Sequence, residues 1–332
     1  MAKAGAQAGA TSRPRRLGCL GLVASVLLAA LGFVAIGGAM SAASGRPEPP
    51  GRMVDIGGRR LHLVCAGPAG SATAGPTVLL EAGAFGFSAD WSVVQDKLAR
   101  QGVRSCAYDR AGLGYSDPGP APRDGLAVTS DLDKLLAAAG EPGPYILVGH
   151  SMAGLYVPLF ARRHQDQTVG VVLVEGATPE SSLSGQMKTF AVQFGRLAGL
   201  ADGAAAVGLL KPFAFMGDAI GLEPRGAAEK RWAFAHAAHN HWAAAEVSQW
   251  MNAAQQAHDA GPLDPKLPVA IVTAGHAPAE WDRLRAEPAR RSKHGYYENV
   301  PAAAHATLLG IRFADHIVTA IDHVRAAAAA PG

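Results

Sequence analysis

The chain has little cysteine, and the few cysteines it has fit no common metal-binding pattern. Three cysteines occur in 332 residues, at Cys19, Cys65 and Cys106. Their spacing matches none of the patterns that bring thiolates together around zinc. The sequence therefore predicts no cysteine-based metal centre.

Charged residues are also scarce and unevenly distributed. They make up 17% of the chain, which has a formal net charge of +3. The first 45 residues contain no Asp or Glu but four basic residues (Lys3, Arg13, Arg15 and Arg16), so the rest of the chain sums to 3 − 4 = −1. Because nucleic-acid binding depends on clustered Lys and Arg, we expect no nucleic-acid partner.

Residues 17–40 form a long apolar run without a charged side chain. About 20 apolar residues span the hydrocarbon core of a bilayer. The basic residues just before the run favour a cytoplasmic segment over 1–16 and export of the chain beyond the run. The sequence thus predicts a membrane anchor that holds an exported (periplasmic or extracellular) domain through a Pro/Gly linker over residues 41–52.

A signal peptide that is removed after export is the alternative interpretation of this run. The apolar core of a signal peptide has roughly 7–15 residues, which is shorter than residues 17–40. This difference favours the uncleaved anchor. Small residues at Ala39, Ser41 and Ala42 keep cleavage and secretion open.

Short apolar runs alternate with helical spacing along most of the chain. Strands are expected over residues 53–56, 59–65, 77–81, 103–108, 145–148, 169–175, 268–273 and 296–300. Helices are expected over 90–100, 126–139, 152–163, 280–291 and 313–327. Such alternation is typical of a mostly parallel sheet with helices on both faces.

The alternation is interrupted by Ala-rich helical stretches over residues 178–264. We interpret this segment as a helical cap inserted into a core formed by residues 53–177 and 265–332. A helical insert between strands of one sheet is well placed to cover a site at the sheet edge.

The most specific motif is the hexapeptide that begins at Gly149 and reads GHSMAG. It follows an expected strand and opens an expected helix, which is the context of a nucleophile elbow. The tight turn of such an elbow exposes a serine hydroxyl and needs small flanking residues. Gly149 and Ala153 occupy those positions, so Ser151 is the candidate nucleophile.

At this point the chain resembles the α/β-hydrolase superfamily, in particular its serine esterases and lipases. The resemblance rests on LLEAGAFG (79–86), YDRAGLGYSD (108–117), LVGHSMAG (147–154) and a histidine near the carboxyl end, and it covers roughly residues 53–325. It implies an oxyanion hole formed by the backbone amides of Ala84 and Met152. In this family the Asp109-Arg110 stretch is mostly scaffold.

His305 is the candidate general base, because a serine hydroxyl needs an adjacent imidazole at neutral pH. It comes after the last expected strand, where this fold delivers its base. Three further histidines (His236, His239 and His241) are clustered in the cap. No cysteine or carboxylate accompanies them, so a solvated helix face is favoured over a metal site.

Two carboxylates compete for the third position of a catalytic triad. The usual place, after strand 268–273, offers no acid before Glu280 and Asp282. Glu175 ends the strand that comes after the nucleophile helix, which is the other place known in this fold. A carboxylate at the end of an apolar strand needs a partner, so Glu175 is preferred and Asp282 stays open.

These residues predict a hydrolase that cleaves a carboxylic ester through an acyl-enzyme, without metal or organic cofactor. The partners expected are a small ester or acyl substrate and, through residues 17–40, the membrane. Amide or peptide hydrolysis, lactone opening and acyl transfer on the same fold remain alternatives. A non-catalytic ligand-binding protein on a hydrolase scaffold is the alternative from another class.

The resemblance also leaves a disulfide between Cys65 and Cys106 open. In the sheet order of this superfamily the strands that contain them are neighbours, and an exported domain meets an oxidising compartment. The opposing interpretation is a pair of free thiols packed as small apolar side chains.

Overall fold

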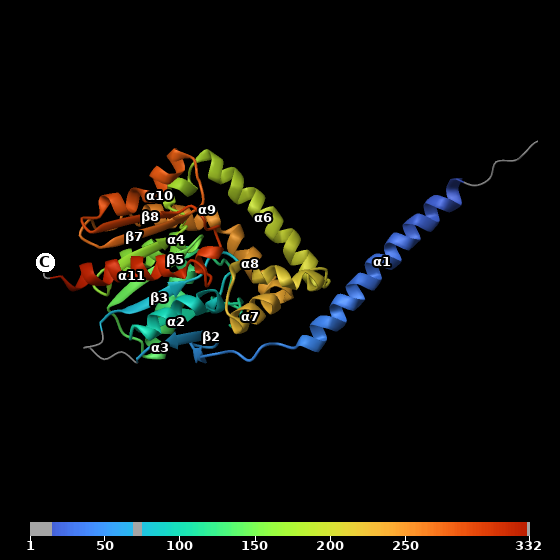
Figure 1. Cartoon of the computed structure of the whole chain (residues 1–332), viewed down its shortest axis with the longest axis horizontal. Helices are drawn as coiled ribbons and strands as arrows, with labels where there is room; N and C mark the ends of the chain where they lie inside the picture. Colours follow the sequence, from blue (N-terminus) through green and yellow to red (C-terminus); the bar gives the residue numbers. More distant parts are fainter. Residues whose placement is uncertain (1–14, 69–74, 331–332) are drawn as a thin grey trace, which may run out of the picture.

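The computed structural model describes residues 15–68 and 75–330, and its centre is an eight-stranded sheet (Figure 1). The strand order is β1-β2-β4-β3-β5-β6-β7-β8. The strands are β1 (Arg52–Asp55), β2 (Arg60–Ala66), β3 (Thr77–Glu81), β4 (Ser105–Tyr108), β5 (Tyr145–His150), β6 (Thr168–Val174), β7 (Val269–Ala274) and β8 (Gly295–Val300). Strand β2 runs antiparallel to both its neighbours, and the other pairs are parallel.

Helices cover both faces of the sheet. Helices α2 (Ser92–Arg100) and α11 (Ala314–Ala329) pack on one face. Helices α3 (Gly125–Ala139), α4 (Ala153–Arg163) and α10 (Ala279–Arg291) pack on the other. Short 3₁₀ turns η1 (Ser88–Trp91) and η3 (Thr307–Leu309) precede α2 and α11. The α/β-hydrolase fold expected from the sequence is thereby confirmed.

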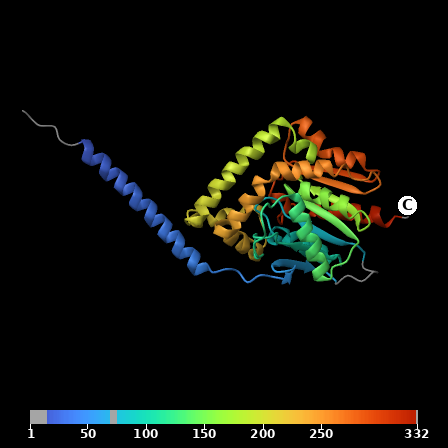
Figure 2. The same ribbon diagram turned by 180° about the vertical axis from the view of Figure 1, so that it is seen from behind.

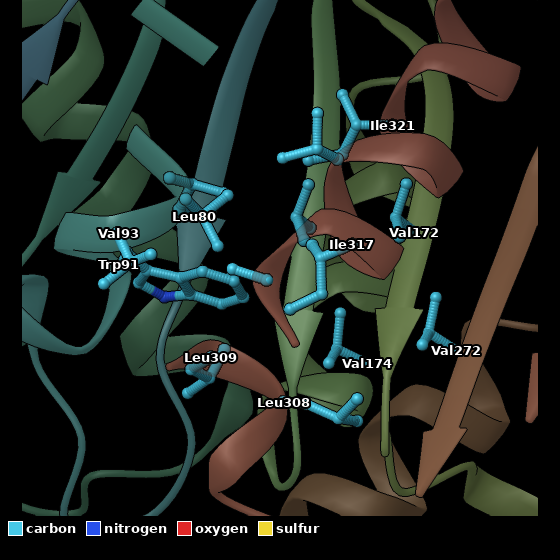
Figure 3. Packing of buried hydrophobic residues seen from close by; sticks show 14 of the residues in the cluster. Leu80, Trp91, Val93, Val172, Val174, Val272, Leu308, Leu309, Ile317 and Ile321 are labelled. Atoms are coloured by element: carbon cyan, nitrogen blue, oxygen red, sulfur yellow. The ribbon is translucent and has the colours of Figure 1, made fainter. Parts of the chain in front are cut away.

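The apolar runs become strands because both of their faces are covered. All residues of β5 are buried, and so are all but one of β6. On one face Val172 and Val174 meet Ile317 and Ile321 of α11, as Figure 3 shows. Strands that are buried on both faces have continuous rather than alternating apolar sequences. These strands could therefore be predicted from the sequence.

Between β6 and β7 the described chain is helical, over the segment interpreted as a cap. It comprises α5 (Pro179–Ser182), α6 (Gly185–Ala206), η2 (Lys211–Ile220), α7 (Pro224–Ala235), α8 (Ala237–Ser248) and α9 (Trp250–Asp259). Side chains of α7 and α8 bond to the loops that come after β3 and β4. The cap therefore sits over the carboxyl ends of the central strands.

The amino-terminal helix α1 (Arg15–Ser44) projects away from the rest of the chain (Figure 2). Its stretch Leu20–Ala39 has 20 residues with a mean hydropathy of 2.5, and only 6% of its apolar window is buried. By length and composition this helix can cross a membrane. Lys3 and Arg13, two of the basic residues that favour its orientation, lie outside the described residues.

A disulfide joins Cys65 of β2 to Cys106 of β4, so the bridge left open by the sequence is present. The two residues are directly opposite in the antiparallel pair, and their Cα atoms are 4.1 Å apart. The bridge ties the antiparallel edge of the sheet to its parallel centre. Such bonds persist in oxidising compartments.

Candidate active site

The sheet topology brings two loops together at its centre. The chain passes from β3 to β4 on one side and then to β5 on the other, so β3 and β5 are neighbours. Glu81, the last residue of β3, is paired with Gly149 of β5. The loop after β3 and the elbow after β5 therefore adjoin at a topological switch point, where open α/β sheets bind ligands.

Strained backbone is concentrated at this point. Among the described residues, three non-glycine residues have a positive φ: Phe85 at 57°, Ser151 at 56° and Glu175 at 47°. The left-handed region is costly for such side chains and is retained mainly where structure and function require it. All three lie in segments that the sequence singled out for catalysis.

The elbow at Ser151 is held by backbone hydrogen bonds. The Ser151 amide donates to the Val174 carbonyl at 3.0 Å, and its own carbonyl accepts from Gly154 at 3.0 Å and Ala177 at 2.9 Å. A Cβ added at Gly154 would lie 2.3 Å from the Ala177 oxygen. Glycine is thus required just after the elbow, because the neighbouring strand end passes so close.

His305 lies in the loop between β8 and η3, with about half of its side chain exposed. Its Nδ1 is 3.2 Å from Oε2 of Glu175. An ionised carboxylate can only accept, so Nδ1 carries the proton and donates it. Nε2 is then left with a free lone pair, which is the form that a general base needs.

The carboxylate of Glu175 has a partner for each oxygen. Oε1 accepts from the Ala274 amide at 2.7 Å and from Arg285 at 2.6 Å, while Oε2 faces His305. Burial favours the neutral acid, but the hydrogen bonds from His305 and Ala274 outweigh it, and the pKa of this carboxyl lies below its usual value. Glu175 therefore stays charged at neutral pH.

Asp282, the alternative acid, is not paired with His305. It lies in the first turn of α10 and accepts from Arg285 at 2.8 Å, three residues further along the helix. Arg285 thereby joins the two carboxylates, with Asp282 on its outer side and Glu175 on its inner side. The structure thus pairs Glu175 with His305. Asp282 is connected to that pair only through Arg285.

The loop from Ala82 to Phe87 and the start of α4 contain the predicted oxyanion donors. Met152 is buried directly after the elbow and precedes the first residue of α4. Within the described part of the chain, neither its amide nor that of Ala84 donates to a protein acceptor. Both amides are thus available to a ligand, and the Met152 amide has the added field of a helix amino end.

A buried arginine fixes the backbone of this loop. Arg110 donates to the carbonyl oxygens of Ala82 at 2.6 Å and Gly83 at 2.9 Å. Its charge is balanced by Glu81 at 2.7 Å and by Glu246 of the cap helix α8 at 2.8 Å. The Asp109-Arg110 stretch is therefore scaffold, as the resemblance implied. The cap contributes Glu246 to this scaffold.

The cap holds the same loop at a second point. The Phe85 carbonyl accepts from Lys230 of α7 at 3.1 Å and from Nε2 of His239 of α8 at 3.2 Å. Nδ1 of His239 accepts from the Gly114 amide at 3.0 Å. Burial lowers the pKa of His239 to about 3, so the imidazole is neutral and acts as a fixed donor and acceptor.

The other cap histidines have separate partners. His236 caps α8, and His241 lies on the surface 3.1 Å from Asp202. The prediction of a solvated helix face therefore holds for His241 but is wrong for His239, which is buried between the cap and the core. Helix periodicity alone could not reveal this contact, because its partners lie more than a hundred residues away.

His150, which precedes Ser151, contacts the loop that contains His305. Its Nε2 donates to the His305 carbonyl at 3.1 Å, and the two rings are 4.8 Å apart. Burial, followed by the nearby His305, lowers its pKa to about 3. A neutral His150 therefore helps to position the loop that contains His305.

Three residues that shape the site were not predicted from the sequence. Arg285 lies three positions after Asp282 on an expected helix, a spacing that pairs opposite charges. Glu246 is an isolated acid in an Ala-rich helix, where an exposed acid gives the same pattern. No local pattern identifies Lys230, because its partners Asp90 and Phe85 are distant in the chain.

Residues 76–212 match the family described as "alpha/beta hydrolase fold". The chain is 37% identical over 130 residues to the Hormonema carpetanum protein named "Probable transporter efuK", which covers 38% of this chain and 18% of that protein. It is 31% identical over 121 residues to an "AB hydrolase superfamily protein" of Gibberella zeae, which covers 35% of this chain and 37% of the relative. The matches thus span less than half the length of these relatives.

Solved structures with the same fold cover most of the chain. A Thermogutta terrifontis esterase is 20% identical with a TM-score of 0.60, over 80% of this chain and 94% of that chain. An enol-lactonase of Burkholderia xenovorans LB400 is 20% identical with a TM-score of 0.58, over 82% and 99%. A Pseudomonas aeruginosa protein provisionally classed as an epoxide hydrolase is 17% identical with a TM-score of 0.63, over 83% and 96%. Similarity at these identities establishes the fold alone.

Proposed function

We propose that this chain, which belongs to the α/β-hydrolase superfamily, is a serine hydrolase that cleaves carboxylic esters through an acyl-enzyme. One observation carries the proposal: the backbone is strained at both Ser151 and Glu175, and Glu175 in turn is hydrogen-bonded to His305. Strain of this kind persists where a fold must present a side chain in one orientation.

Each of these residues has its own step in the reaction. Ser151 Oγ attacks the ester carbonyl while His305 takes the hydroxyl proton at Nε2. Glu175 stabilises the imidazolium that forms, and the amides of Ala84 and Met152 donate to the oxyanion. His305 then returns the proton to the leaving alcohol. Water, activated by the same imidazole, hydrolyses the acyl-enzyme and releases the acid.

We further propose that α1 anchors the chain and that the catalytic domain is exported. The apolar stretch of α1 is long enough to cross a bilayer. The disulfide between Cys65 and Cys106 supports an oxidising compartment for the catalytic domain. In spheroplasts with an intact inner membrane, protease should remove a C-terminal tag from the full chain without lysis, and a protected tag would contradict this orientation.

The catalytic proposal is tested by replacing the nucleophile. With a panel of esters of graded chain length, Ser151→Ala should lower turnover by a factor on the order of 10⁶. Its circular dichroism and melting temperature should match those of the wild type. Retention of more than a few per cent of activity would remove Ser151 from the mechanism. Matched amides and lactones in the panel decide whether ester cleavage is the preferred reaction.

A further inference from the structure

The cap has an outer surface that is apolar and exposed. Its members lie on α6, on η2 and in the turn between them, and we call them the outer cap surface: Phe190, Val192, Leu197, Leu200, Val207, Leu209, Phe213, Phe215 and Met216. Leu200 is 70% exposed and Phe215 is 63% exposed. An exposed apolar patch of this extent marks a surface that meets a partner or a membrane.

Helix α6 buries small residues and exposes large apolar residues, the reverse of an ordinary surface helix. Its buried positions are three alanines spaced seven apart: Ala191, Ala198 and Ala205. The solvent face repeats at helical spacing with larger residues: Phe190, Leu197, Leu200 and Val207. A helix on a water-soluble protein buries its large apolar stripe. The sequence of α6 is instead suited to an apolar environment outside the protein.

The outer cap surface is continuous with the proposed membrane helix. The rings of Phe33 in α1 and Phe213 in η2 are 5.7 Å apart, and a Cβ added at Gly37 would lie 2.5 Å from Pro212. The apolar span ends at Ala39, six residues after Phe33 (39 − 33 = 6). Six helical residues rise about 9 Å, and the two from Gly37 to Ala39 rise about 3 Å. The contacts therefore place η2 in the outermost part of the span, near the roughly 5–10 Å that interfacial segments reach.

The direction of α6 agrees with this placement. In Figures 1 and 2, α6 lies along the edge of the domain on the side of α1 and runs crosswise to it. A helix crosswise to a membrane-spanning helix lies along the membrane plane. Helix α6 contains two exposed basic residues, Lys188 and Arg196, and one acidic residue, Asp202, so its charge is positive. The surface charge therefore suits anionic lipid headgroups.

Aromatic side chains connect the outer cap surface to the candidate oxyanion loop. The rings of Phe85 and Phe194 are 6.2 Å apart, and those of Phe194 and Phe190 are 5.6 Å apart and stacked. Phe85 belongs to the loop next to Ser151, whereas Phe190 is part of the exposed surface. An acyl chain that leaves the membrane at Phe190 would meet apolar side chains along this path.

We infer that the outer cap surface docks on the bilayer that holds α1, and that the substrate is an acyl lipid of that bilayer. This deepens the proposed function and rests on it for the chemistry of cleavage. The bilayer is the occupant, because the membrane span of the same chain contacts the surface and fixes its depth. The ester carbonyl reaches Ser151 as the acyl chain enters along the aromatic path.

Docking can be measured without catalysis, by the depth of a spin label. The full chain with Cys19→Ala is placed in vesicles of phosphatidylcholine and phosphatidylglycerol, and the label is attached at Leu200→Cys. Cys65 and Cys106 are bridged and take no label. Gln165→Cys is the control, because Gln165 is exposed and precedes β6 at the opposite end of the sheet.

At Leu200 we expect relaxation by oxygen to exceed relaxation by a water-soluble nickel chelate, and the reverse at Gln165. A label at Leu200 that the nickel chelate relaxes as at Gln165 would overturn the docking. A label shielded from both reagents would also overturn it, because a protein surface, such as a second copy, would then cover α6.

The substrate class is tested with paired assays on the reconstituted chain. One substrate is a phosphatidylcholine with a fluorogenic acyl chain in the vesicle, and the other is a soluble short-chain ester. Leu197→Gln combined with Leu200→Gln should lower lipid hydrolysis by about tenfold or more, since each exchange removes apolar contact with the bilayer. Hydrolysis of the soluble ester should stay within about twofold.

Leu126→Gln is the matched control, because Leu126 is an exposed leucine on α3, outside the cap. It should leave both rates unchanged. A wild type that cleaves the soluble ester but no vesicle lipid would overturn the substrate assignment. If the wild type cleaves neither, the proposed function fails, while the label depth still decides the docking.

Discussion

Charged side chains are buried around the candidate site, whereas large apolar side chains are exposed on the outer cap surface. Glu246 is fully buried and paired with Arg110, whereas Leu200 is 70% exposed and belongs to none of the buried apolar clusters of the described residues. A soluble domain with independent surfaces shows the reverse distribution. The inner groups fix backbone positions next to Ser151, and the outer groups leave apolar area available to an external phase.

This contrast separates two kinds of contribution to function. A buried ionic group destabilises the fold unless it has a charged or hydrogen-bonding partner. Removal of one partner therefore lowers the stability of the whole fold. Exposed apolar side chains contribute little to folding stability. Their removal therefore weakens only the binding of the membrane or partner that they contact. Substitutions in the two regions therefore have different readouts.

The largest expected effect is on the inner carboxylate at His305. Glu175→Gln should lower turnover by a factor of roughly 10³–10⁴, because the imidazole loses the partner that fixes its tautomer and stabilises its charged form. Asp282→Asn is the matched control on the outer side of Arg285, and we expect less than about a tenfold loss. The opposite ranking of turnover numbers would assign the acid to Asp282.

Removal of the cap carboxylate Glu246 should have the second-largest effect. Glu246→Gln leaves the buried Arg110 with one charged partner and should cost about 3–5 kcal/mol of unfolding free energy. Turnover should fall by roughly a hundredfold, because the loop that contains Ala84 loses its fixed position. Urea unfolding and ester turnover measure the two effects.

The control for Glu246 is an exposed ion pair in the same cap. The side chains of Arg231 and Asp218 are 41% and 46% exposed, so Asp218→Asn should cost less than about 1 kcal/mol. Equal losses in the two variants would mean that the buried network does not hold the cap to the core.

The neutral His239 predicts a pH dependence of stability. Its pKa is lowered from 6.5 to about 3 in the folded chain. Between these values the unfolded chain binds a proton that the folded chain does not, so stability decreases as the pH falls below 6.5. The contribution of one such histidine is at most about 1.4 kcal/mol per pH unit.

The His239→Gln variant should therefore lose less stability than the wild type between pH 7 and pH 5. His150 is retained in both proteins, so the difference isolates His239. Equal slopes in denaturant titrations across this range would show that His239 is accessible to protons in the folded chain.

The smallest expected effect is on the outer cap surface. Leu200→Gln should change the unfolding free energy of the detergent-solubilised chain by no more than about 0.5 kcal/mol, as for other exposed positions. A loss above about 1 kcal/mol would mean that Leu200 is packed against protein, which would remove the contrast between the two regions.

Regular packing made much of the fold predictable. Strands such as β5 and β6 are buried on both sides, so their apolar runs were visible without knowledge of their neighbours. The elbow at Ser151 was predictable because a sharp turn needs small residues in a fixed order. The preference for Glu175 came from the cost of a carboxylate at the end of a buried strand.

Contacts across the cap were not predictable in the same way. The partners of Arg110 include Glu246, which is 136 residues away. His239 and Lys230 likewise meet the Phe85 carbonyl through the tertiary fold. Their side chains look like surface residues in a helix of mixed composition, and only the packing of the cap on the core gives them buried partners.

The most direct test of the central claim is to identify the residue that reacts with a fluorophosphonate probe. Activity-based labelling of the full chain in membranes, combined with peptide mass spectrometry, should place the adduct on Ser151. Labelling should be lost in Ser151→Ala and strongly reduced in a His305 variant, because the hydroxyl is activated by that imidazole. An adduct on another serine, or no adduct on a folded wild type, would contradict the assignment of this protein as a serine hydrolase.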